Sequence, residues 1–237
     1  MKAWQGENDF ALFKSTTPTS NKQIWKAFYQ LHKDKIQVQK EAVAVEKLKI
    51  IIKATFKLSN QKGFSLMSLR DLSNETNISM GSLYAYIGSK SQLAEMIHQF
   101  LPHIFDLCIG EQLEKDAPCL EKLTTLVRGH VFITEILQPW FFFAYMETKH
   151  LRRSTKRLAK ESELKSESLL QKILQSGIKQ NSFNSIDPFL TSMMIKSLLQ
   201  NWYIKNAKYK SQKTNCETYI DFIESVIQNH LVNTNGK

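Results

Sequence analysis

The sequence predicts an all-α protein, and two observations carry that prediction. Apolar residues recur about every 3.6 positions through most of the chain, and the strict alternation typical of strands is almost absent. Only 8 Gly and 5 Pro interrupt the 237 residues, which leaves room for long helices. A chain of this length holds one or two domains of about 100–200 residues, each large enough for a hydrophobic core.

Residues 1–40 form a separate, partly helical N-terminal extension. The segment is too aromatic for a disordered tail. Asn21 is a candidate N-cap for a helix on which four side chains share one face. The aromatic and face residues of the extension are Trp4, Phe10, Phe13, Trp25, Phe28, Tyr29 and His32.

Residues 41–92 predict a compact group of short helices. An apolar stripe from Leu48 to Leu58 marks the first helix, which ends at Gly63. Three helix starts follow within about 25 residues, and each begins at a capping serine. Their caps are Ser68 with Asp71, Ser79, and Ser89 with Gln92.

The stretch from Ser68 to Tyr86 has the layout of a helix-turn-helix motif. A helix of about eight residues is followed by a three-residue turn and a second short helix capped by Ser79. Asn77 stands in the turn, where a left-handed backbone is needed. We expect the second helix to present an outward face suited to the floor of a major groove, formed by Met80, Gly81, Ser82, Tyr84 and Tyr86.

At this point the sequence resembles the tetracycline-repressor (TetR) family of transcriptional regulators, over about residues 45–93. The matching motifs are Gly63-Phe64, Asp71-Leu72-Ser73, Gly81-Ser82-Leu83-Tyr84-Ala85-Tyr86 and Ser89-Lys90. Mild departures are Met67, Asn77 and Ile87-Gly88. The resemblance implies base or nearby backbone contacts by Ser82, Tyr84 and Tyr86. It implies that the duplex is positioned by Ser68, Arg70, Ser79 and Lys90.

Residues 93–237 predict a larger helical domain, and the resemblance implies that it is the ligand-binding and dimerisation domain. The clearest helices are expected over residues 120–137, 140–177, 188–206 and 215–231, with Asp187-Pro188 and Thr214 with Glu217 as starts of the last two. The resemblance implies that such a domain dimerises through its last two long helices. Their apolar stripes are broader than one packing face needs, which independently favours a homodimer.

The run from Trp140 to Met146 is apolar on every face of a helix, so it lines a pocket, a dimer seam or only core. In the pocket interpretation the ligand is a hydrophobic small molecule. Its predicted contacts are His98, Phe105, Gln138, Trp140, Phe141, Phe142, Tyr145 and Met146.

Charge and composition narrow the function classes. The net charge of +10 favours a polyanionic partner, either nucleic acid or a membrane surface. Phosphate loops, nucleophile elbows and metal-ligand spacings are absent, so no enzyme activity, cofactor or metal is expected. The three cysteines are too few and scattered for a disulfide framework, and we see no signal peptide or spanning segment, which predicts a cytoplasmic protein.

The sequence therefore predicts a DNA-binding regulator, a repressor released from a palindromic operator by a hydrophobic molecule. One alternative is a regulator with a solid C-terminal core that a protein partner controls. The other is a basic protein that binds membrane surfaces.

Overall fold

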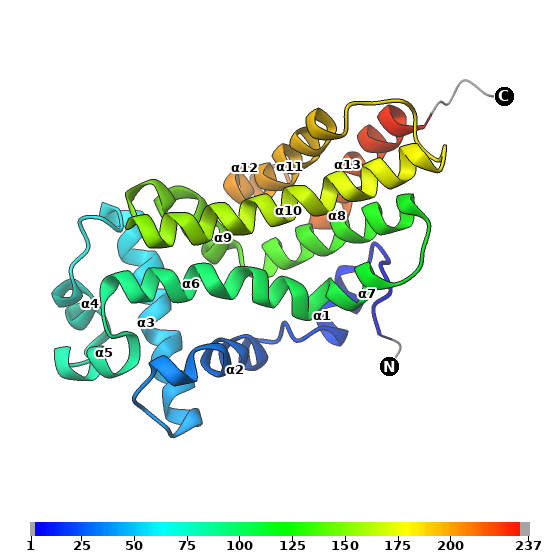
Figure 1. Cartoon of the computed structure of the whole chain (residues 1–237). Helices are drawn as coiled ribbons and strands as arrows, with labels where there is room; N and C mark the ends of the chain where they lie inside the picture. The colour runs from blue at the N-terminus through cyan, green and yellow to red at the C-terminus, as the bar shows by residue number, and fades with distance from the viewer. Residues whose placement is uncertain (1–2, 233–237) are drawn as a thin grey trace. The chain divides into compact units, whose positions relative to one another are not determined.

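The computed structural model describes residues 3–232, without the side chain of His150, and every regular element in that range is helical. The α-helices are α1 (Phe10–Thr16), α2 (Asn21–His32), α3 (Glu41–Lys62), α4 (Leu69–Thr76), α5 (Met80–Ile87), α6 (Lys90–Phe105), α7 (Glu111–Glu114), α8 (Cys119–Ile136), α9 (Gln138–Glu147), α10 (Arg153–Lys179), α11 (Pro188–Ile204), α12 (Asn206–Ser211) and α13 (Cys216–Leu231). Short 3-10 turns span Lys33–Lys35 and Thr148–His150, and a π-helical turn spans Asp106–Gly110. The predicted all-α class is confirmed (Figure 1).

The chain forms two compact units. The first unit comprises residues up to Thr19, Phe105–Gln138 and the chain from Ser162 on, and the second comprises Ser20–Ile104 and Pro139–Glu161. All of the predicted helix-turn-helix segment, residues 41–92, lies in the second unit. The aromatic extension is divided between them, because α1 belongs to the first unit and α2 to the second.

The core of the second unit is an aromatic cluster centred on Trp140. The ring centroids of Trp25, Phe28, Phe56 and Phe100 lie 5.0–5.4 Å from that of Trp140. Trp140 is therefore enclosed by side chains of α2, α3 and α6, and its burial stabilises the unit.

The second helix of the extension begins at Asn21, and its N-cap is Ser20, one residue before the predicted cap. Ser20 and Gln23 form a capping box, whereas the Asn21 side chain accepts a hydrogen bond from the indole nitrogen of Trp25 at 2.7 Å. Farther along, the Nε2–H of His32 donates to the carbonyl of Met96 at 3.0 Å. Burial lowers the pKa of His32 to about 4, so the ring is neutral at pH 7.

The core of the first unit surrounds Phe132 of α8. The rings of Trp4, Phe10 and Phe13 lie 5.3–6.4 Å from it, so the aromatic start of the chain is packed into this core. Gly6 has φ +107°, and a Cβ there would stand 2.5 Å from the Thr125 hydroxyl, which excludes other residues.

Polar contacts also hold the start of the chain. Arg128 pairs with both carboxylate oxygens of Glu224 at 2.6 and 2.7 Å and donates a third hydrogen bond to the carbonyl of Gly6. Such a bidentate ion pair fixes α8 against α13 and the N-terminal segment.

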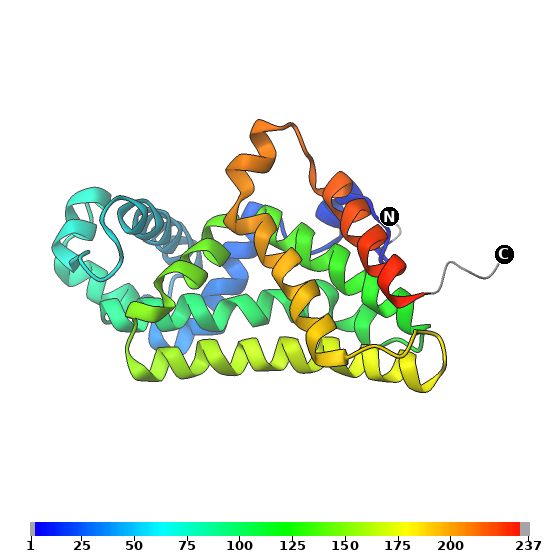
Figure 2. The ribbon, with the colours of Figure 1, turned by 90° about the horizontal axis from the view of Figure 1, so that it is seen from above.

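Helices α11 and α13 run antiparallel and lie side by side (Figure 2). The Tyr219 hydroxyl donates to the carbonyl of Leu198 at 2.8 Å, and Thr191 bonds His230 at 3.1 Å at the other end of the pair. Their exposed apolar side chains are Phe189, Leu190, Met193 and Phe222.

Two sequence predictions about helix ends are wrong. The segment 140–177 is interrupted after Glu147, where the Thr148 hydroxyl bonds back to the carbonyl of Ala144 and the chain turns before α10. At α13 the cap is Asn215, which accepts from Thr218 N at 2.8 Å, and not Thr214.

Candidate DNA-binding site

Helices α3, α4 and α5 form a small three-helix arrangement in the second unit (Figure 1). Leu72, Ile78 and Leu83 are buried between them. Asn77 adopts the predicted left-handed conformation, with φ 53° and ψ 32°, and Ser79 caps α5 by accepting from Ser82 N. The turn therefore fixes the angle at which α5 leaves α4.

Ser68 and Asp71 form the predicted capping box at the start of α4. Asp71 also pairs with Lys62 of α3 at 2.8 Å. The Lys62 ammonium, followed by the N–H and hydroxyl of Ser68, holds the pKa of the Asp71 carboxyl well below its usual range. The carboxylate therefore ties α4 to α3 at any pH near neutrality.

Lys90 has a different position from the predicted phosphate contact. Its ammonium donates to the carbonyls of Phe64, Ser65 and Met67 at 2.7–2.9 Å, and its Nζ stands 5.0 Å from the centre of the Phe64 ring. These bonds use all three N–H groups of the ammonium. Partial burial lowers its pKa, against the opposing charges of Glu147 and Asp71. Lys90 therefore holds the loop between α3 and α4 in place through these three carbonyl groups.

The outward face of α5 contains most of the predicted residues. Ser79, Gly81 and Tyr84 are exposed, Met80 and Ser82 are half-buried, and Ser68 and Arg70 of α4 are exposed. A Cβ placed on Gly81 meets no atom within 4 Å, so nothing in the protein itself requires a glycine there.

The expectation that Tyr86 also points outward is wrong. Tyr86 is 4 % exposed, because it stands three residues after Leu83 and one before Ile87, on the face that packs inward. Tyr84, which is 47 % exposed, is the tyrosine on the outer face.

The N-terminal extension supplies a feature that sequence reasoning missed. The backbone N–H of Gln37 donates to the carbonyl of Ala85 in α5 at 2.9 Å. This hydrogen bond joins the loop after α2 to α5, and Gln39 and Lys40, the last residues of that loop before α3, are exposed. The sequence signal for a role of this loop in binding DNA is its three lysines, Lys33, Lys35 and Lys40.

The predicted ligand contacts are divided between the two units. Phe105 and Gln138 belong to the first, where the Gln138 amide donates to the carbonyl of Tyr203 at 2.9 Å. The other six belong to the second unit, where Trp140 is core, Phe141 and Phe142 are half-buried, and Tyr145 and Met146 are exposed.

His98 is the buried polar residue of that predicted set. It is 7 % exposed, its Nε2 has no hydrogen-bond partner within the described chain, and burial lowers its pKa to about 4. Within residues 3–232, no group of three or more His, Cys, Asp or Glu side chains is placed to hold a metal ion. Among the described helices, none combines the length and apolar character needed to cross a bilayer.

A short helix with a small-residue N-terminus, held by a tight turn against a second helix, is the arrangement of helix-turn-helix DNA-binding proteins. The chain belongs to the TetR family of bacterial regulatory proteins. Residues 51–97 match the model of that family, and residues 116–214 match the model of a tetracycline-repressor-like C-terminal domain. The protein is therefore a DNA-binding transcriptional regulator and not an enzyme.

Relatives are similar over most of the chain at low identity. The HTH-type transcriptional regulator HbdR of Aromatoleum sp. (strain CIB) is 21 % identical over 156 residues, which are 66 % of this chain and 68 % of HbdR. AibR, solved with isovaleryl coenzyme A and operator DNA, superimposes with a TM-score of 0.66 at 17 % identity and covers 76 % of this chain and 97 % of its own. FadR of Bacillus subtilis, solved with stearoyl-CoA, has a TM-score of 0.60 at 15 % identity and covers 76 % of this chain and 96 % of its own.

Proposed function

We propose that the protein is a homodimeric repressor that places α5 of each protomer in the major groove of a palindromic operator. The observation that carries this proposal is the outer face of α5, where Gly81 is open and Tyr84 is exposed while Leu83 and Tyr86 anchor the helix from behind. Small residues permit close approach to base edges, and the tyrosine ring or hydroxyl reaches a thymine methyl or a phosphate.

Flanking residues position the duplex in this proposal. Ser68, Arg70 and Ser79 lie exposed at the ends of α4 and α5. Lys40 forms no ion pair within the described residues and follows the loop bonded to α5, so we add it as a phosphate contact. Met80 and Ser82 complete the face that reads bases.

Selection of bound genomic fragments, followed by footprinting, tests this function. We expect two symmetric half-sites a whole turn apart, about 34–36 Å or a multiple.

Tyr84→Ala should weaken operator binding about tenfold or more. Lys40→Met should weaken all sequences alike and lower the salt slope by about 1. A single asymmetric site protected by a monomer would contradict the proposal.

The dimer is supported by the apolar side chains left exposed on α11 and α13. Phe189 and Phe222 are more than half exposed, which is costly for a protomer alone in water. Phe189→Glu with Phe222→Glu should yield folded monomers with poor operator affinity in sedimentation and gel-shift measurements. Ile223, also apolar in the predicted stripe, is fully buried in the protomer and cannot serve for this test.

The effector we propose is an acyl coenzyme A ester, a hydrophobic chain on a polar carrier. Support comes from AibR and FadR, which were solved with isovaleryl coenzyme A and stearoyl-CoA. In this chain, the buried and unpartnered Nε2 of His98 is a candidate polar contact, and Phe142 and Met146 are candidate apolar ones.

Release of operator DNA by short- and long-chain acyl coenzyme A esters, with free coenzyme A as control, tests the effector. His98→Leu should reduce release while ligand-free DNA binding is kept. If no ester changes operator affinity, control by a protein partner replaces this part of the proposal. We also propose a cytoplasmic location, because the proposed function requires access to operator DNA. A liposome sedimentation assay that detects no binding would exclude the membrane-surface alternative.

A further inference from the structure

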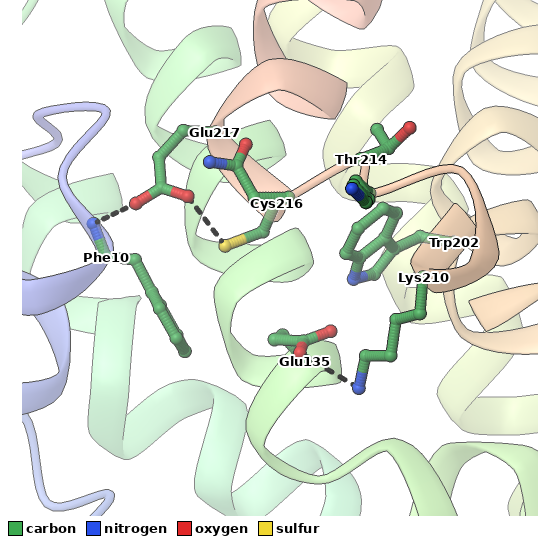
Figure 3. A pocket seen from close by; sticks show the side chains of 9 residues that line it. Phe10, Glu135, Trp202, Lys210, Thr214, Cys216 and Glu217 are labelled. Carbon is green, nitrogen blue, oxygen red and sulfur yellow. Dashed lines mark hydrogen bonds and ion pairs between the residues drawn. The ribbon is translucent and has the colours of Figure 1, made fainter. Parts of the chain in front are cut away.

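A pocket that is open to solvent lies in the first unit, and none of the predicted ligand contacts lines it. The cavity has a volume of about 320 Å³ (Figure 3). It lies among the end of α8, the α11–α12 segment, the start of α13 and α1 of the N-terminal extension. Its lining residues are Phe10, Glu135, Trp202, Lys210, Lys213, Thr214, Asn215, Cys216 and Glu217.

The two carboxylates of the lining are already paired. Glu135 accepts from the Asn206 amide at 3.1 Å and forms an ion pair with Lys210 at 3.3 Å. Glu217 accepts from the backbone N–H of Phe10 at 3.4 Å and from the Cys216 thiol at 3.1 Å. The acids therefore hold the walls together and do not demand a cation.

The unused hydrogen-bonding capacity belongs to donors. Trp202 is 1 % exposed, yet its indole N–H has no partner within the described chain, which is uncommon for a buried donor. In Figure 3 the indole nitrogen is on the edge of the ring that faces the space beside Glu135 and Lys210. The ring cannot turn away, because it is stacked on Tyr219 at 4.8 Å and contacts Tyr209 at 5.3 Å.

Lysine ammonium groups add to this donor surplus. One N–H of the Lys210 ammonium points to Glu135, which leaves two N–H groups for a ligand. Lys213 forms no ion pair within residues 3–232. The opposite wall is apolar, since the Phe10 ring lies across the cavity from Trp202 and Lys210 in Figure 3.

We propose that this cavity binds a small aromatic monocarboxylate. The carboxylate accepts from the Trp202 indole N–H and the Lys210 ammonium, with Lys213 nearby, and the aromatic ring packs against Phe10. The proposal is independent of the acyl coenzyme A effector, whose size far exceeds this cavity.

Size and charge both favour this ligand class. An enclosed cavity of about 150 Å³ accommodates benzene, so this open pocket of about 320 Å³ has room for one or two rings with a carboxylate that stays partly in solvent. Two lysines against two glutamates leave the lining neutral, so a monoanion gains hydrogen bonds without strong repulsion, whereas a polyanion meets Glu135 and Glu217. Phe10 gives the N-terminal extension a binding role, because α1 supplies one wall.

Titration of the full-length protein with benzoate and 1-naphthoate tests the proposal, with the indole N–H resonances followed by NMR and no DNA present. We expect saturable binding that shifts one indole resonance, which Trp202→Phe identifies by its loss. Trp202→Phe and Lys210→Met should each weaken binding about five- to tenfold. Lys208→Met, on the same helix α12 but outside the lining, is the matched control and should bind like the wild type.

Three results would overturn the proposal. These are no saturable shift at millimolar benzoate, equal binding by Lys210→Met and Lys208→Met, or equal binding of toluene and benzoate. Thermal unfolding of each variant separates lost binding from lost folding. Replacement of Lys210, whose side chain is 58 % exposed, should leave the fold intact. Since the readout needs no operator, its failure is distinct from failure of the proposed DNA binding.

Discussion

Helices α5 and α9 have similar lengths, 8 and 10 residues, but they differ in how their side chains are packed. In α9 the ring of Trp140 is enclosed by four other aromatic rings. In α5 the outer face is open at Gly81 and Tyr84. The difference separates two tasks: α9 stabilises the second unit, and α5 presents a surface to a partner. Substitutions in the two helices should therefore change stability and DNA affinity independently.

The largest effect on stability is expected for Trp140→Ala. Loss of a fully packed indole should lower the free energy of unfolding by about 3–5 kcal/mol. Urea unfolding measures this change, with Tyr145→Ala, half exposed on the same helix, as a control that costs less than about 1 kcal/mol. A Trp140→Ala protein as stable as the wild type would mean that the cluster around α9 is not the core.

The same core should make stability depend on pH. Burial holds the pKa of His32 and of His98 at about 4, against an ordinary value of about 6.5. The unfolded chain then binds more protons than the folded chain, so the free energy of unfolding falls as pH is lowered from about 6.5 towards 4. The loss approaches about 3 kcal/mol per histidine at the lower limit.

Chemical denaturation between pH 7 and 4.5 measures this dependence. A His32→Gln, His98→Gln double variant should have a flatter profile than the wild type, even if its stability at pH 7 is lower. Parallel profiles would show that these two rings do not control acid sensitivity.

On the α5 side of the comparison, Lys90→Met should lower stability by about 1–3 kcal/mol, because three carbonyls lose their charged donor. The salt dependence of operator binding should stay unchanged. Lys57→Met, which breaks an exposed pair with Glu75, is the control and should cost less than about 1 kcal/mol. Unchanged stability with a salt slope reduced by about 1 would restore the phosphate contact predicted from the sequence.

The sequence predicts the parts of the site that depend on neighbours a few residues away. The capping pair Ser68 and Asp71, the turn at Asn77 and the cap at Ser79 are interactions across three or four residues, and all are present. The spacing of Tyr86 to Leu83 also indicates that Tyr86 points inward, in conflict with the outward position expected from the motif.

Contacts between distant segments could not be predicted in this way. The position of Lys90 depends on how the loop from Phe64 to Met67 returns to α6. The cavity of the first unit joins Phe10 to Glu217, which are far apart in the chain, and no residue pattern marks such a meeting. Trp140 shows the same limit, because the sequence of an apolar run is the same whether the run fills a core or lines a pocket.

The smallest effect on stability, and the sharpest separation of the two tasks, is expected for Gly81→Ala. The added methyl group meets open space, and alanine favours helix by up to about 1 kcal/mol over glycine, so the variant should be as stable as the wild type or slightly more stable. If α5 enters the major groove, the same methyl group holds the helix away from the base edges, and operator affinity should fall about tenfold or more. Asn60→Ala, exposed on α3, should change neither property appreciably and serves as the control. Gel-shift titration beside thermal unfolding measures both quantities on one preparation. Unchanged operator affinity in a Gly81→Ala protein would mean that the open face of α5 is not the surface that meets DNA.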